Sequence, residues 1–79
     1  MSALSDQGGA VVAISARNQL PGTVTSIATG EVMAEVEVAV GEHRIVSVIT
    51  RRSVEELGLS QGDKVTVVIK STEVMLAKD

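Results

Sequence analysis

The residues best suited to bind a small ligand are hydrogen-bond donors near the start of the chain. Ser15, Arg17 and Asn18 place a hydroxyl, a guanidinium and a carboxamide within four residues. All three groups can donate hydrogen bonds to a tetrahedral oxyanion, and the guanidinium also supplies positive charge. From composition alone the same residues could instead form the polar start of a strand. An anion-binding cluster and a polar strand entry are therefore both open interpretations.

Two further donor clusters occur later in the sequence. Lys70 and Ser71 stand at the end of a predicted strand, and Thr50 and Ser53 flank the start of a predicted helix. The free N–H groups and the dipole at a helix N-terminus favour an anion. Ser, Thr and Lys at strand ends nevertheless usually serve turns and caps. Convergence of the three clusters into one site is a hypothesis that depends on the fold.

The sequence offers few residues for catalysis or for binding a metal cation. His43 is the only histidine and stands at a predicted hairpin edge, and there is no cysteine to act as a nucleophile, so catalysis has no obvious carrier. Glu35 and Glu37 could act as paired carboxylates, but on the polar face of a strand we interpret them as solvated. One histidine without an acidic cluster makes no metal site, and the glycines lack phosphate-loop spacing. We expect a protein that is not an enzyme and that uses neither a metal cation nor an organic cofactor.

Length and charge narrow the class of protein further. The chain has 79 residues, enough for one small domain, and a formal net charge of −3, which disfavours nucleic acid and anionic membranes as partners. The start of the sequence has neither the basic residues nor the long apolar stretch of a signal peptide or membrane span, so we expect a cytoplasmic location.

The hydrophobic residues of this chain include no Phe, Tyr or Trp, although hydrophobic residues make up 44% of the sequence. Barrels that bind single-stranded nucleic acid rely on stacking aromatic side chains and a basic groove, so this alternative is disfavoured. A small domain with so much apolar surface and no disulfide gains stability by self-association. We therefore expect a homo-oligomer.

Alternating apolar residues predict strands through most of the chain. Residues 31–40 show the clearest period of two, with Val32, Ala34 and the following valines on one face and glutamates on the other. Further strands are expected over residues 20–28, 44–50, 64–70 and 74–77. Successive strands without a βαβ period predict an all-β fold, here a small OB-like β-barrel of about five strands.

A single short helix is expected between these strands. Ser53 and Glu56 have capping-box spacing, and Gly58 suits a left-handed C-cap, so the helix is predicted over residues 53–58. Residues 1–12 show turn chemistry without periodicity and are expected to form a flexible tail. The remainder shows no repeat and no linker, so residues 13–79 are expected to form a single domain.

Residues 15–22, with the sequence SARNQLPG, resemble the opening signature of the molbindin (Mop) family of TOBE-type domains. The similarity continues in the family's order and spacing through residues 31–40, residues 45–50, SVEELG at 53–58 and VIKSTEVM at 68–75. The opening run is specific for the family when it occurs together with the closing IKST.

The resemblance implies an OB-like barrel that exchanges strands between subunits to form dimers, and hexamers built as trimers of dimers in stand-alone members. It also implies oxyanion sites that span two chains. Carried over by position, Ser15, Arg17 and Asn18 of one subunit face four residues of another, namely Thr50, Ser53, Lys70 and Ser71. Arg17 and Lys70 are then the charged pair, whereas Arg51 and Arg52 receive no role from the pattern.

The ligand implied by the resemblance is molybdate or tungstate. Molybdate is a fully deprotonated dianion at neutral pH, so a site made only of donors can satisfy all its oxygens. Phosphate keeps a proton near pH 7 that such a site leaves unpaired, whereas sulfate has to be excluded by its size. Storage and buffering of the oxyanion is the function we expect. The alternative is a ligand-sensing domain cut from a molybdate-responsive transcription regulator or a molybdate transporter ATPase.

Overall fold

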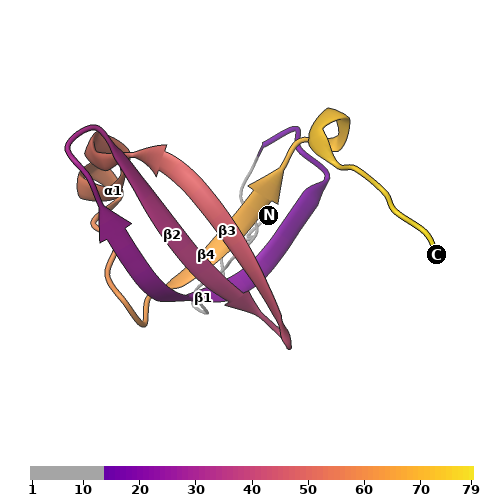
Figure 1. Cartoon of the computed structure of the whole chain (residues 1–79), viewed down its shortest axis with the longest axis horizontal. Coiled ribbons are helices and arrows are strands. Elements are labelled where there is room, and N and C mark those ends of the chain that lie inside the picture. The colour runs from indigo at the N-terminus through magenta and orange to yellow at the C-terminus, as the bar shows by residue number, and fades with distance from the viewer. Residues whose placement is uncertain (1–13) are drawn as a thin grey trace.

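The computed structural model describes residues 14–79, which form one four-stranded antiparallel sheet and a short helix (Figure 1). The strands are β1 (Asn18–Thr29), β2 (Met33–Val40), β3 (His43–Thr50) and β4 (Lys64–Ile69), and the helices are α1 (Arg51–Leu57) and the short 3-10 helix η1 (Ser71–Glu73). The strand order is β3-β2-β1-β4. This confirms the predicted all-β class with one short α-helix. The tail predicted over residues 1–12 lies outside the described residues.

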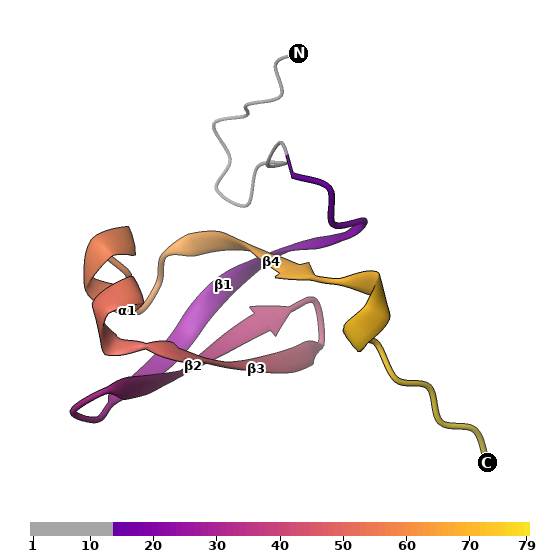
Figure 2. The same ribbon diagram turned by 90° about the horizontal axis from the view of Figure 1, so that it is seen from above.

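The C-terminal part of the chain differs from the sequence-based prediction. The strand expected over residues 74–77 is wrong, because β4 is followed by η1 and then by chain without regular structure. These last residues project away from the sheet (Figures 1 and 2), where no neighbouring strand can bond their backbone groups. The sheet of the described residues is therefore open, with β3 and β4 as its edges, rather than closed into a barrel.

The strand boundaries around the first hairpin also shift. β1 begins at Asn18 rather than at residue 20, and β2 begins at Met33 rather than at residue 31. The later start of β2 has a local cause, since the Gly30 amide donates to the Met33 carbonyl oxygen at 2.7 Å. This tight connection takes Glu31 and Val32 out of the ladder, and Val32 is 69% exposed instead of facing the core.

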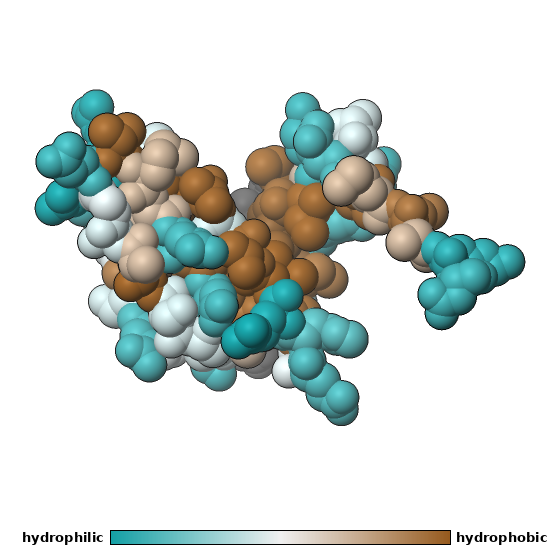
Figure 3. Space-filling view, viewed as in Figure 1, coloured by the Kyte–Doolittle hydropathy of each residue, from teal (hydrophilic) through white to brown (hydrophobic). Residues whose placement is uncertain are grey.

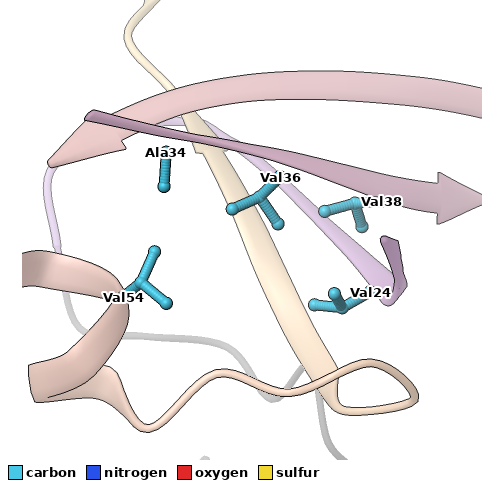
Figure 4. Packing of buried hydrophobic residues seen from close by; sticks show 5 residues of the cluster. All are labelled: Val24, Ala34, Val36, Val38 and Val54. Carbon is cyan, nitrogen blue, oxygen red and sulfur yellow. The ribbon is translucent and has the colours of Figure 1, made fainter. Parts of the chain in front are cut away.

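The core is aliphatic and small. Its buried side chains point toward one another between the sheet and α1 (Figure 4), and they are Val24, Ala34, Val36, Val38 and Val54. Three of them occupy alternate positions of β2, which confirms the predicted period of two over residues 34–38. Each buried valine contributes about 1.5–3 kcal/mol. A core of this size leaves a single copy of a short chain only marginally stable.

The bend in β1 divides the molecule into two arms (Figure 1). The first half of β1 pairs with β4 and the second half pairs with β2. The register of the β1–β2 ladder shifts between Val24 and Ser26, and an irregularity of this kind bends a strand and increases its twist. One arm consequently carries β2, β3 and α1, and the other carries β4 and η1.

Gly22 allows β1 to pass close to β2 at this bend. A Cβ atom there would lie 2.6 Å from Val38 Cγ1 and 2.7 Å from the Ala39 carbonyl oxygen. We predict that Gly22→Val lowers the thermal unfolding midpoint by about 10 °C, since overpacking costs about 1–3 kcal/mol. Gly30→Ala is the control, because its Cβ would meet only the Met33 carbonyl oxygen at 3.3 Å. Equal midpoints for the two variants in scanning calorimetry would contradict this role.

Candidate anion-binding site

The N-terminal donor cluster and the cluster of Lys70 and Ser71 meet at one end of the sheet. Asn18 and Ile69 form the terminal pair of the β1–β4 ladder. Arg17 directly precedes Asn18 and Lys70 directly follows Ile69, so the two predicted cations flank this pair. Asn18 Nδ2 donates to the Ile69 carbonyl oxygen at 3.2 Å. We call this donor cluster the β1–β4 end, and its residues are Ser15, Arg17, Asn18, Lys70 and Ser71.

The β1–β4 end is open to solvent. Asn18 is half-buried, and the other four residues of the cluster are exposed. None of these four side chains forms a hydrogen bond or ion pair with another part of residues 14–79. The hydroxyl, ammonium and guanidinium donors of this cluster are thus available to an external anion.

The second donor cluster lies on the other arm, at the start of α1. Thr50 is the N-cap of the helix, because its Oγ1 accepts a hydrogen bond from the Ser53 amide at 3.0 Å. The Thr50 hydroxyl also donates to Ser53 Oγ at 2.8 Å. The predicted capping box is therefore wrong, since Ser53 lies inside the first turn and the helix starts at Arg51. The predicted left-handed C-cap is confirmed at Gly58, which has a φ of 64°.

Arg51 and Arg52 form ion pairs along α1. Arg51 Nε lies 3.1 Å from Glu55 Oε2, and Arg52 Nε lies 3.1 Å from Glu56 Oε2. All four side chains are largely exposed, and pairs of this kind contribute about 0.3–0.5 kcal/mol each. Both arginines line an open pocket together with Thr50. Their positive charge is thus partly compensated by carboxylates one turn away.

The β1–β4 end and the donor cluster at the start of α1, which we call the two donor groups, do not touch within one chain. No hydrogen bond or ion pair in residues 14–79 joins Thr50 or Ser53 to the β1–β4 end. The groups stand on different arms, at opposite ends of β1 along the sheet (Figure 1). One copy of the described chain therefore brings together two of the three predicted clusters and leaves the third apart.

An open apolar cleft separates the arms. Figure 3 shows hydrophobic residues in the hollow of the molecule. The residues that line the cleft include Val24, Val36 and Val38, together with Ile49 of β3 and Val67 of β4. Both edge strands of the sheet therefore border the cleft. Aliphatic side chains without nearby charge suit an apolar segment of protein better than an oxyanion.

The residues considered for catalysis lie elsewhere. His43 is exposed at the first position of β3, as predicted for a hairpin edge, and Glu35 is exposed on β2. Glu37 lies 3.6 Å from Arg44 in an ion pair between neighbouring strands. Residues 14–79 hold no group of three or more His, Cys, Asp or Glu side chains placed to bind a metal ion. Across the same residues, neither helix has the length and apolar character needed to cross a membrane.

Comparison with known proteins assigns the fold to a family. The TOBE domain matches residues 14–76, which include both donor groups. This chain belongs to the TOBE domain family. Molybdenum-pterin-binding protein 1 of Clostridium pasteurianum is 48% identical to this TOBE domain over 66 residues, which cover 82% of this chain and 97% of the relative. The resemblance to the Mop family is thereby confirmed.

Solved structures support the same assignment of the TOBE domain. A molybdate-binding protein from Sporomusa ovata superposes with a TM-score of 0.81 at 42% identity, covering 85% of this chain and 100% of that chain. The cytoplasmic molybdate-binding protein ModG, solved with molybdate bound, superposes with a TM-score of 0.71 at 46% identity, covering 76% of this chain and 43% of that chain.

Proposed function

We propose that this TOBE domain binds molybdate or tungstate and serves to store and buffer the oxyanion in the cytoplasm. The observation that carries the proposal is the β1–β4 end, where Arg17 and Lys70 flank one strand pair with the hydroxyls of Ser15 and Ser71 nearby in sequence. The names of the two molybdate-binding proteins of known structure support the ligand and, for ModG, the location. The relative matched over 97% of its length is named as a binding protein, which favours binding over a sensing module of a larger protein.

The donor chemistry favours a fully deprotonated dianion. Arg17 and Lys70 can each make a charge-assisted hydrogen bond, worth about 1.5–3 kcal/mol. The hydroxyls add neutral donors that can turn their hydrogens toward the ligand. A protonated phosphate would present a donor of its own to this positively charged cluster, which makes it a poorer ligand.

We also propose that a second copy completes each site. The resemblance assigns Lys70 and Ser71 to the opposite subunit, but they lie beside Arg17 and Asn18 of the same chain. The β1–β4 end of one copy would therefore face Thr50 and Ser53 of another. Support comes from the separation of the donor groups on two arms, since one chain does not place Thr50 and Ser53 beside Arg17. Two copies related by twofold symmetry could bring the α1 arm of one chain beside the β4 arm of the other. The dimer would then contain two equivalent contacts of this kind.

The residues after η1 offer a means of joining two copies, and we call residues 74–76 the C-terminal arm to distinguish them from the two arms of the sheet. Val74, Met75 and Leu76 are 46%, 91% and 93% exposed, and they follow η1 away from their own cleft (Figures 1 and 2). The cleft between the arms is lined mostly by apolar residues and bordered by β3 and β4, the edge strands of the sheet formed by residues 14–79. If the arm of one copy fills the cleft of the other, its side chains leave water and its backbone gains a strand partner. The resulting dimer would be the unit of a larger homo-oligomer, a hexamer formed as a trimer of dimers.

Isothermal titration of the purified protein tests the proposed ligand. At one fixed salt concentration we expect molybdate and tungstate to bind with similar affinity, because their size and charge nearly coincide. Sulfate should bind at least about tenfold more weakly, because a smaller ion leaves donors underused. Phosphate should bind more weakly still at pH 7. Absence of binding with both molybdate and tungstate would refute the proposal.

A further inference from the structure

The Gln19 side chain forms a hydrogen bond to the short segment that carries Ser15 and Arg17. Its side-chain Nε2 donates to the Ala16 carbonyl oxygen at 2.8 Å. Ala16 stands between Ser15 and Arg17 in the sequence, so this contact holds the peptide that links the two proposed ligands. Residues 14–17 precede the β1–β4 ladder, whose terminal pair begins at Asn18. Ladder hydrogen bonds therefore do not fix this bend, whereas the Gln19 side chain does.

Asn18 makes a complementary contact at the same end of the sheet. Its hydrogen bond to the Ile69 carbonyl oxygen holds the peptide that leads into Lys70. Successive residues of a strand point to opposite faces, so Asn18 and Gln19 act from the two sides of β1. Both side chains are half-buried, which limits competition from water. One amide thus fixes the Lys70 side of the β1–β4 end, and the other fixes the side of Ser15 and Arg17.

We propose that Gln19 is a positioning residue of the anion site, which acts by holding the bend that presents Ser15 and Arg17. This inference rests on the proposed function. A long arginine side chain on an unrestrained backbone must be ordered when the ligand binds, and that ordering reduces affinity. Hydrogen bonds that hold metal-binding side chains in place typically change metal affinity by about 10- to 100-fold, and we expect an effect at the lower end of this range for a contact that orders the anion-binding residues. The Gln19 amide is suited to this role because it donates to a carbonyl oxygen without adding charge beside the anion.

Gln19→Met tests the inference, because methionine keeps a similar length and lacks the N–H donor. We expect this variant to bind molybdate about tenfold more weakly in isothermal titration at fixed salt. Gln61→Met is the matched control, since Gln61 is exposed in the turn before β4, and its affinity should stay within about twofold of the unsubstituted protein. Gln19→Leu is a second variant that stays uncharged and loses the donor, and it should weaken binding as well.

Backbone dynamics separate positioning from general loss of structure. In the anion-free Gln19→Met protein, the 15N heteronuclear NOE of residues 15–17 should fall, while the values for β2 and β3 should stay unchanged. Wild-type affinity in either folded Gln19 variant, or unchanged NOE values at residues 15–17, would overturn the inference and leave the proposed function intact. Failure of the unsubstituted protein to bind molybdate would overturn the proposed function itself.

Discussion

Lys70→Ala is expected to weaken molybdate binding by about 10- to 100-fold. Lys70 flanks the terminal pair of the β1–β4 ladder opposite Arg17, and its ammonium group is one of the two proposed charged partners of the dianion. Loss of a hydrogen bond to a charged group costs about 1.5–3 kcal/mol, and each 1.4 kcal/mol corresponds to about a factor of ten. Arg17→Ala should have an effect of similar size for the same reason.

Two matched controls separate this local role from the loss of net positive charge. Lys64 opens β4 at the other end of the same ladder, where it pairs with Thr23, so Lys64→Ala removes one lysine far from the site. Arg44 is an exposed arginine paired with Glu37, and Arg44→Ala is the control for Arg17→Ala. Both controls should change affinity by less than about threefold, through long-range electrostatics alone. Equal losses in the Lys64 and Lys70 variants would show that the site has been assigned to the wrong end of β4.

Removal of the C-terminal arm is expected to abolish both oligomerisation and anion binding. A chain ending at Glu73 lacks Val74, Met75 and Leu76, the apolar residues proposed to fill the cleft of a partner. Without them the cleft and both strand edges stay exposed, and no second copy is held in place to complete the site. Analytical ultracentrifugation should show a shift from oligomer to monomer, and isothermal titration with molybdate should show a loss of at least about 100-fold.

A shorter truncation provides the control for this experiment. A chain ending at Ala77 loses only Lys78 and Asp79, which carry opposite charges, so net charge and the apolar arm are both retained. This protein should sediment and bind molybdate like the full chain. An oligomer of unchanged size in the protein that ends at Glu73 would show that another surface joins the copies.

The elements that could be predicted from the sequence are those fixed by local patterns. The alternation in β2 identified its buried face because successive strand residues point to opposite sides. Gly58 identified the end of α1 because a left-handed cap favours glycine. The three donor clusters could likewise be chosen by residue type, and the structure places two of them at one end of one sheet.

The remaining features depend on contacts between distant residues. Thr50 and Ser53 are both residue types that favour the N-cap of a helix. The Arg51 amide donates to the Val32 carbonyl oxygen at 2.8 Å, and this contact with a distant residue accompanies a helix that begins at Arg51 with Thr50 as its N-cap. The SARNQLPG run does not single out Gln19, because its proposed role depends on a contact with Ala16 that only the structure shows. A polar side chain directly after a donor cluster is the only signal of such a role in the sequence.

The short η1 turn connects the sheet to the C-terminal arm. It lies between the last strand of the sheet and the apolar arm, and it spans only Ser71–Glu73. If two copies exchange their C-terminal arms with each other, the assembly is a closed dimer. If each copy instead passes its arm to the next copy, the assembly is an open-ended chain. In residues 14–79 the sheet has β3 and β4 as its edges, so under the proposed exchange the direction in which the arm leaves η1 would separate a finite assembly from a fibre.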